Sequence, residues 1–381
     1  LPIFAFEVVR SLAKMGVSQA VVAGVTREDR VDMPEGVTVY PVYFSSEKLP
    51  YPVVGMSDEM PYTSTRYRDM TEEMAGQFKA AFLEVLDEAI EKENPDIILC
   101  HHLYYLTALI RAHYPAKKVY GFCHNTDLRQ MESILFERNF IRQEIPKLDR
   151  IFALQEAQKE KIKKIYPVSE KQMTVIGTGY NSEVFKKTGI KLSRKDGKIR
   201  MIFAGKITQK KGVKSLLRAL NLLDYEKEKI QLILAGGAGN LVEYEEIKEL
   251  ADGCRYPVVF AGCVTQSRLA ELYNDCDIFV LPSMYEGLPL TVIESLACGD
   301  RVVMTKLEGI AEWLADMVPD ADIRYVLPPG MKGTDEPLEE ELPAFESRLA
   351  EALREAIEEK DTKECDVSRI SWQKIAREVI R

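Results

Sequence analysis

The sequence lacks both a paired-cysteine pattern and a long apolar run. Its seven cysteines are scattered, their number is odd and none forms a C-x-x-C pair. Neither a disulfide framework nor a zinc ribbon is therefore expected, and we predict reduced, mostly buried thiols. No segment approaches the roughly 20 apolar residues that a membrane-spanning helix needs. We therefore expect a cytoplasmic protein with no transmembrane segment.

An excess of positive charge is missing as well. The formal net charge is −9, which counts against binding of nucleic-acid phosphates over a broad surface, so no nucleic-acid partner is expected. This charge leaves room for a local basic pocket that binds one small anion. The sequence contains no G-x-x-x-x-G-K-[ST], which excludes a P-loop ATPase, and the glycines at 236–239 lack the full G-x-G-x-x-G spacing.

The composition that remains is that of a globular chain, with 46% hydrophobic and 29% charged residues among 381. A chain of this length suits two domains of roughly 100–200 residues. Apolar strands alternate with helical patterns in two series, which predicts an α/β fold with two parallel sheets. The expected strands are 20–25, 37–43, 97–101, 118–123, 150–154 and 173–176, then 200–204, 231–235, 258–261, 278–282, 301–305 and 324–327.

A polar, charged stretch at 182–198 separates the two series and predicts a linker. The expected domains are 1–181 and 199–362, followed by a helical segment at 363–381 that crosses back to the first domain. In consecutive α/β domains, ligands bind at the carboxyl ends of the strands, facing the cleft between the domains. A long irregular segment at 45–69 in the first domain is expected to be functional.

The most informative stretch is 283–299, which reads SMYEGLPLTVIESLACG. A buried strand should end just before it, and a helix should begin near Leu288 or Pro289, because proline suits a first helical turn. Glu286 precedes this helix and Glu294 lies in its second turn. The two carboxylates can therefore accept hydrogen bonds from two separate hydroxyl-bearing rings. An acid that complements the helix dipole, together with a surface glutamate, is the alternative.

The start of this helix is also a candidate anion site, because its first N–H groups lack intrahelical partners. The turn consists of Gly287, Leu288, Pro289 and Leu290.

A second stretch, FAGKITQKKG at 203–212, places Gly205 and Lys206 directly after a strand and Lys211 before a helix. Two ammonium groups beside a glycine turn suit a diphosphate, because lysine binds phosphate as a point charge. A basic surface loop is the alternative.

All four histidines lie between 101 and 124. His101 and His102 end one expected strand and His124 ends the next, where active-site groups gather; hydrogen-bonded core histidines are the alternative. Their spacing is not that of a zinc site. The sequence Asp275-Cys276-Asp277 matches the D-x-D that holds a divalent metal in some sugar transferases. It lies between a helix and a buried strand, and no metal site is predicted.

Together these stretches resemble the family 4 glycosyltransferases, which are retaining enzymes of the GT-B fold, over nearly the whole chain. The most specific part is the E-x7-E element of Glu286 and Glu294, joined by the lysine stretch at 205–212 and by VIGTG at 175–179. The resemblance implies two Rossmann-like parallel-sheet domains that face a central cleft. In the family the chain opens with a strand and a Gly-Gly loop, which would precede Leu1.

The resemblance also implies roles for the residues. Glu294 would bind the ribose of a nucleotide sugar, and Glu286 the hydroxyls of the transferred sugar. Lys206 and Lys211 would neutralise the diphosphate leaving group, and His124 would lie near the sugar. The family usually has arginine in place of Lys206, so the charge is kept but the bidentate fork is lost. Gly205 and the 287–290 turn complete the expected donor site.

The resulting hypothesis is a retaining, metal-independent glycosyltransferase without a cofactor. It would move a hexosyl group from a nucleotide-diphosphate sugar to an acceptor. The acceptor could be a sugar, a lipid or a small molecule, and peripheral membrane contact and the oligomeric state are left open. Two alternatives are a GT-B enzyme resembling nucleotide-sugar 2-epimerases and a non-catalytic nucleotide-sugar-binding protein.

Overall fold

The computed structural model describes residues 3–57, 60, 62–189, 191, 196–333, 336–359 and 365–381. The chain forms two compact units, unit 1 (Leu1–Thr178 and Ser371–Arg381) and unit 2 (Gly179–Ile370). Parts of the expected linker, residues 190 and 192–195, and the expected boundary at 362–363 lie outside the described residues. The described part of that stretch packs on unit 2: Phe185 is buried in its core, and the backbone N–H of Thr188 donates to Asn274 Oδ1 at 2.7 Å.

Unit 1 contains parallel sheets, as the strand–helix alternation predicted. Strands β1 (Gln19–Val25) and β2 (Val37–Tyr43) pair with each other. A four-stranded sheet has the order β5 (Ile97–His101), β6 (Lys118–Phe122), β7 (Arg150–Ala153), β8 (Met173–Val175). The helices are α1 (Ile3–Lys14), α2 (Glu72–Glu93), α3 (Tyr105–His113), α4 (Thr126–Ser133), α5 (Arg138–Glu144), α6 (Glu156–Ile165) and α14 (Trp372–Val379).

The segment at 45–69 is more regular than the sequence predicted. It contains the short parallel strands β3 (Val54–Gly55) and β4 (Thr65–Arg66). The side chain of Gln130, on α4, donates to the carbonyl oxygen of Met56 at 3.0 Å. This bond ties the segment to a helix that begins two residues after His124.

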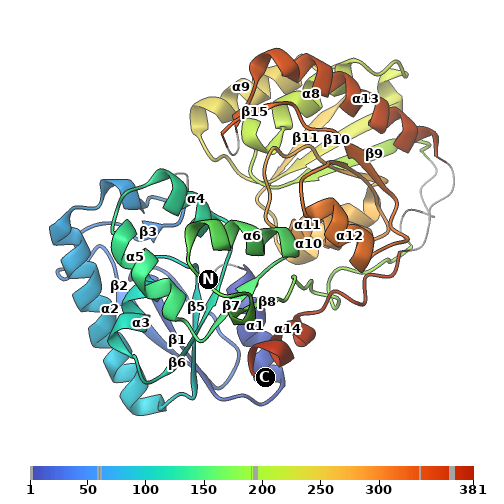
Figure 1. Ribbon diagram of the computed structural model, residues 1–381. Coiled ribbons are helices and arrows are strands. Elements are labelled where there is room, and N and C mark those ends of the chain that lie inside the picture. The colour runs from blue at the N-terminus through green and yellow to red at the C-terminus, as the bar shows by residue number, and fades with distance from the viewer. Residues whose placement is uncertain are drawn as a thin grey trace. The chain divides into compact units, whose positions relative to one another are not determined.

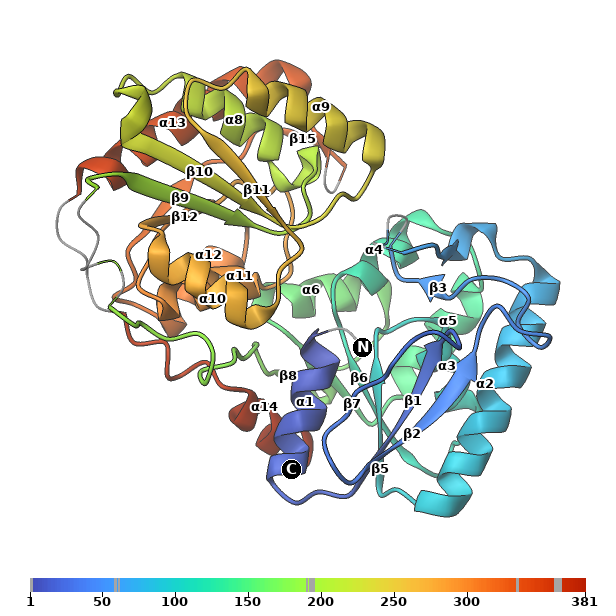
Figure 2. The same cartoon turned by 180° about the vertical axis from the view of Figure 1, so that it is seen from behind.

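The last helix belongs to unit 1, although it follows unit 2 in the chain. Figure 2 shows α14 lying beside α1. The ring of Trp372, at the start of α14, meets that of Phe4 at a centroid distance of 5.0 Å and an interplanar angle of 88°. Trp372 is buried, so this edge-to-face contact is part of the hydrophobic interior of unit 1.

Unit 2 is built on a six-stranded parallel sheet with the order β11-β10-β9-β12-β13-β14. The strands are β9 (Ile199–Ala204), β10 (Ile230–Ala235), β11 (Val258–Gly262), β12 (Ile278–Leu281), β13 (Arg301–Thr305) and β14 (Ile323–Val326). Numbered within the unit, this order is 3-2-1-4-5-6, that of the doubly wound dinucleotide-binding fold. From β9 to β11 each new strand is added on one side of β9, and from β12 to β14 each is added on the other side. The carboxyl ends of β9 and β12 therefore form the topological switch point, where ligands bind in such folds.

Helices cover both faces of this sheet. In Figure 1, α8, α9 and α13 lie on one side of the strands, and α10, α11 and α12 on the other. Their bounds are α8 (Val213–Asn221), α9 (Leu241–Asp252), α10 (Gln266–Asp275), α11 (Leu290–Ala297), α12 (Ile310–Met317) and α13 (Leu342–Glu358). The short antiparallel strands β15 (Met331–Lys332) and β16 (Glu336–Pro337) complete the unit.

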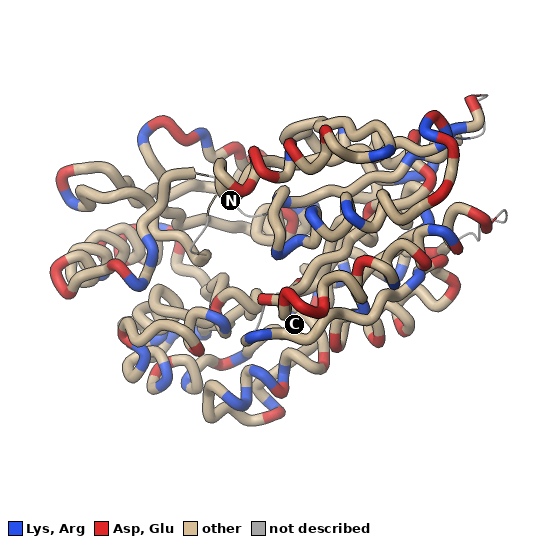
Figure 3. Tube along the Cα trace, turned by 90° about the horizontal axis from the view of Figure 1, so that it is seen from above, with Lys and Arg blue, Asp and Glu red and all other residues tan. Residues whose placement is uncertain are grey.

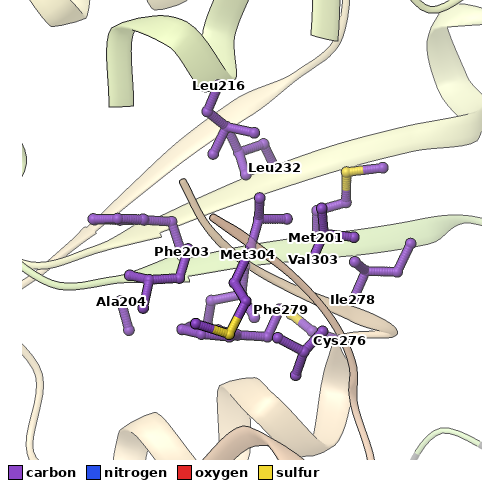
Figure 4. Packing of buried hydrophobic residues seen from close by; sticks show 14 of the residues in the cluster. Met201, Phe203, Ala204, Leu216, Leu232, Cys276, Ile278, Phe279, Val303 and Met304 are labelled. Atoms are coloured by element: carbon purple, nitrogen blue, oxygen red, sulfur yellow. The ribbon is translucent and has the colours of Figure 1, made fainter. Parts of the chain in front are cut away.

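Burial on both faces explains why the strands of unit 2 read as continuous apolar runs. All four residues of β12, Ile-Phe-Val-Leu, are buried. Figure 4 shows Phe279 of β12 and Met304 of β13 on one face of the sheet and Met201 of β9 on the other. Burial of this apolar surface stabilises the central strands, by about 25 cal/mol per Å². The loops at their carboxyl ends therefore start from fixed positions.

Charged residues of both signs are distributed along the described chain. Seen from above in Figure 3, lysine and arginine alternate with aspartate and glutamate along the helices, and neither sign forms a continuous band. Among the described residues, no helix combines the length and the apolar character needed to cross a membrane.

Candidate functional site

Two loops meet at the switch point of unit 2. The β9 loop (205–212) follows β9, and the β12 loop (282–289) follows β12. Lys211 Nζ lies 2.7 Å from Glu286 Oε1, which is a direct ion pair between the loops. The two side chains are 28% and 14% exposed. The structure thus brings together an ammonium group and a carboxylate that the sequence predicted to bind the same substrate molecule.

The backbone holds these loops against each other. The N–H of Met284 donates to the carbonyl oxygen of Lys210 at 2.9 Å. Gly212 has a φ of +74°, and a Cβ built at this position would lie 2.0 Å from the carbonyl oxygen of Pro282. Only glycine permits both this backbone conformation and this close approach. Gly212 therefore sets the spacing across which Lys211 reaches Glu286.

We expect Gly212→Ala to reduce the free energy of unfolding of unit 2 by roughly 2–5 kcal/mol, because left-handed strain adds to the clash with Pro282. The matched control is Gly333→Ala. Gly333 has a φ of +77°, but no atom of the described residues lies within 4 Å of a Cβ built there, so it tests the backbone strain without a described clash. Urea unfolding of both variants measures the difference. Equal losses would show that the approach to Pro282 does not constrain the loops.

A third strand end adjoins the β9 loop. The N–H of Gly205 donates to the carbonyl of Ala235, at the end of β10, and Ile207 N–H donates to the carbonyl of Gly237. A Cβ built on Gly236 would lie 1.7 Å from the carbonyl oxygen of Gly205. The glycines after β9 and β10 therefore allow two backbones to touch. Lys206 follows Gly205 in the β9 loop and is half-buried.

Helix α11 begins later than the sequence predicted. Pro289 is the residue before the helix, with a ψ of 102°, and Leu290 is the first helical residue. The expected start near Leu288 or Pro289 is thus one residue early, because Pro289 takes an extended ψ and is the N-cap. The N-terminus of α11 has no side-chain cap. Its backbone donors and its dipole are thus directed to the end that carries the β12 loop.

Glu294 is a buried residue of α11, 5% exposed. The alternative of a surface glutamate is therefore wrong. The sequence did not single out its neighbour Tyr273 on α10. Burial, and then the negative charges of Glu294 and Asp300, raise the pKa of the Tyr273 hydroxyl well above its ordinary value. Within the described part of the chain, this hydroxyl has no hydrogen-bond partner.

In unit 1 the structure brings three of the four histidines together. His101 Nδ1 lies 3.0 Å from His124 Nε2. The rings of His102 and His124 are 4.7 Å apart between centroids. We call His101, His102 and His124 the histidine cluster. The sequence predicted a role for His124 and one of the pair, whereas both contact it. His113 lies apart on α3, with Nε2 3.1 Å from Asp87.

A buried carboxylate places the histidine cluster. Asp127, in the first turn of α4, accepts hydrogen bonds from the N–H groups of Leu103 at 2.7 Å and His124 at 3.1 Å. It thereby joins the chain after β5 to the chain after β6. His102 and Asn125 have φ values of +70° and +67°, which is a costly backbone conformation typical of functional sites. Sequence analysis missed Asp127 and α4, although Asn125 directly before this helix was a usable start signal.

Burial keeps the cluster uncharged near neutral pH. It lowers the pKa of His101 to about 3, with a smaller contribution from His102, and lowers the pKa of His102 to about 4. Burial, followed by the two neighbouring histidines, holds the pKa of His124 well below 6.5. The rings can therefore donate and accept hydrogen bonds, but they do not supply positive charge at pH 7.

Within unit 2, the D-x-D sequence lies away from the switch point and has other partners. Asp277 Oδ2 accepts from the backbone N–H of Arg200 at 2.9 Å, and Asp275 Oδ2 lies 3.4 Å from Arg200 Nε. Both acids precede β12, at the opposite end of that strand from Glu286. In the described ranges, no group of three histidine, cysteine or acidic side chains is arranged to hold a metal ion.

The strand order of unit 2, its bridged switch point and the parallel sheets of unit 1 define a protein of two Rossmann-like α/β units. Comparisons with known proteins agree with this class. Residues 3–184 match the family described as Glycosyltransferase Family 4, and residues 185–332 match Glycosyl transferases group 1. The two matches follow each other without a break, and the chain belongs to this family of glycosyltransferases, as its sequence predicted.

Three similar proteins illustrate the relationship. An uncharacterized glycosyltransferase, MJ1607 of Methanocaldococcus jannaschii, is 29% identical over 43% of this chain and 44% of its own. The alpha-maltose-1-phosphate synthase of Mycobacterium tuberculosis is 24% identical over 60% and 61%. The chain thus matches about half the length of these relatives. The structure of Anabaena Alr3699/HepE in complex with UDP and glucose superimposes with a TM-score of 0.61 at 14% identity, covering 98% of this chain and 93% of that one. It shares the GT-B fold.

Proposed function

We propose that the protein is a retaining, metal-independent glycosyltransferase that moves a hexosyl group from a nucleotide-diphosphate sugar to an acceptor. The observation that carries this proposal is the ion pair between Lys211 and Glu286 at the switch point of unit 2. A nucleotide-diphosphate sugar needs cationic groups at its phosphates and acceptor groups at its sugar hydroxyls, and the pair offers one of each.

Each part of the proposed donor site has a separate task. Lys206, Lys211 and the N-terminal end of α11 neutralise the departing diphosphate, which is where negative charge grows in the transition state. Glu286 accepts hydrogen bonds from the sugar. Glu294 accepts them from the ribose, and its burial favours a fixed orientation. HepE was crystallised with UDP and glucose, which makes UDP the first nucleotide to test.

In the reaction we propose, the bond between sugar C1 and the phosphate oxygen breaks, and a bond from C1 to the acceptor oxygen forms on the same face. The acceptor hydroxyl gives its proton to the departing phosphate, which leaves as the nucleoside diphosphate. This route needs no pair of flanking carboxylates of the kind that glycosidases use.

The acceptor is proposed to bind to unit 1, where His124 contacts it. The free thiols of all seven cysteines support a cytoplasmic location.

The test is calorimetry with UDP. We expect Lys211→Ala to weaken binding by about 10- to 100-fold, because a charge-assisted bond to phosphate is worth roughly 1.5–3 kcal/mol. The control is Lys214→Ala, which removes an ammonium group from another Lys–Glu pair of unit 2, that with Glu246 at 2.6 Å. Unchanged affinity in Lys211→Ala would contradict the proposed donor site.

The stereochemistry of transfer, its independence of metal ions and the class of activity can each be measured separately. NMR of the product should show the anomeric configuration of the donor, and EDTA should leave the rate unchanged. A loss of activity with EDTA that Mn²⁺ reverses would contradict metal independence. Conversion of the donor without any acceptor would identify an epimerase instead. Tight binding without turnover of any donor would identify a binding protein.

A further inference from the structure

We propose that His101 is a positioning residue that fixes the tautomer of His124: its Nδ1 accepts a hydrogen bond from the Nε2–H of His124. His124 then keeps its lone pair on Nδ1. This inference rests on the proposed function for its role in transfer, but the pairing itself is a property of unit 1 and can be tested without any substrate.

The distance between the rings sets the protonation. At 3.0 Å, His101 Nδ1 and His124 Nε2 share one proton, because two N–H groups would repel each other and two lone pairs would not bond. Two arrangements satisfy this condition. In one, both rings carry their proton on Nε2; in the other, both carry it on Nδ1. The Nε2–H form is the lower in energy for an isolated histidine side chain. The first arrangement gives this form to both rings and is therefore favoured.

The surroundings hold both rings in this geometry. Phe122 stacks on His101 with an interplanar angle of 6° and a centroid distance of 4.7 Å. Phe4 meets the rings of His101 and His124 edge-on, at 6.0 and 5.0 Å. Asp127 fixes the backbone N–H of His124. The hydrogen bond therefore joins two rings that are already confined, so little freedom is lost in forming it.

The third histidine contacts His124 without sharing a proton with it. Its Nδ1 lies 3.4 Å from Thr126 Oγ1, and its ring is tilted by 58° against that of His124. His102 is therefore the matched control for His101, since both are neighbours of His124 but only one is bonded to it.

The pairing decides what His124 can do. With Nε2 engaged, Nδ1 is the ring nitrogen left to contact a substrate hydroxyl, and it acts as an acceptor. His124 would thus orient an acceptor hydroxyl by drawing on its proton, while the departing phosphate still receives that proton. In the opposite tautomer, Nδ1–H could only donate. The substrate hydroxyl would then accept a hydrogen bond through its oxygen instead of donating its proton.

The experiment is long-range ¹H–¹⁵N NMR of the full chain, with ¹⁵N-labelled histidine, at pH 7.5. The protein has four histidines, and a His124→Asn variant assigns the signals of His124. We expect the Nε2–H pattern for His124. His101→Phe keeps an aromatic ring but removes the acceptor, and should move these signals toward a mixture of tautomers. His101→Asn restores an acceptor near the position of Nδ1 and should restore the pattern. His102→Asn should leave the tautomer unchanged.

Transfer assays supply the second readout. His101→Phe should lower kcat by at least about tenfold with the donor KM nearly unchanged, because the acceptor and not the donor is misoriented. His101→Asn should recover most of the loss. An Nδ1–H pattern for His124, or identical signals in wild type and His101→Phe, would overturn the pairing. An intact pairing in a protein that transfers no sugar would instead refute the proposed function.

Discussion

Glu286→Gln should lower the rate of sugar transfer by about 10²- to 10³-fold, the usual loss when one group that stabilises a transition state is removed. The amide keeps the size of the side chain and can still accept a hydrogen bond. It loses the negative charge that holds the sugar hydroxyls and supports positive charge on the ring. Rates measured with saturating donor and acceptor give this loss as a change in kcat.

The same variant should bind UDP at least as tightly as wild type. The ion pair at 2.7 Å makes Glu286 a competitor for the ammonium group of Lys211, and the amide competes less strongly with a phosphate. The control is Glu246→Gln, which alters the Lys214–Glu246 pair of 2.6 Å in the same unit and should change neither the rate nor the affinity. A Glu286→Gln enzyme with a near-normal rate would remove Glu286 from the site.

Unit 1 should lose stability steeply as the pH falls below about 6.5. The folded pKa values of the histidine cluster lie below the ordinary 6.5, at about 3 for His101 and about 4 for His102. Between these values and 6.5, the unfolded chain binds protons that the folded chain does not, so stability rises with pH and falls with acid. Each ring contributes up to about 1.4 kcal/mol per pH unit, and the three together up to about 4.

This loss can be followed in unit 1 alone. The chain has two tryptophans, Trp372 in unit 1 and Trp313 in unit 2. In a Trp313→Phe variant, the fluorescence of Trp372 therefore reports the unfolding of unit 1 in urea. His113→Gln, outside the cluster, is the control and should keep the slope. A stability of unit 1 that changes by less than about 1 kcal/mol between pH 7 and pH 5 would contradict burial of neutral rings.

The alternation of strands and helices predicted the α/β class and most strand positions, because strands buried on both faces are apolar throughout. The bounds of β2, β5 and β13 agree with the expected ones. For α4 the sequence offered only Asn125 as a start signal. Its residues are mostly polar, and it is held by contacts distant in the chain, such as that from Gln130 to Met56. Local pattern cannot report such contacts.

The candidate site, too, could be predicted only in part from the local sequence. Lys211 and Glu286 were found because each follows a strand end within a recognisable stretch. That they form an ion pair depends on the sheet order, which places β9 beside β12 although 73 residues separate Ala204 from Ile278 in the chain. Tyr273 was passed over for a similar reason, and His101 was named only as one of a pair at a strand end. Each acts through a partner on another element, which the local sequence does not show.

Unit 1 is discontinuous, which has a consequence for its biogenesis. Residues 371–381 are synthesised only after all of unit 2. Until then, α1 lacks its neighbour α14, and Phe4, which packs against the rings of His101 and His124, lacks the indole of Trp372. A nascent chain on the ribosome would therefore expose the apolar face of α1 that α14 later covers, for as long as unit 2 is being made. That face is accessible to chaperones throughout this interval.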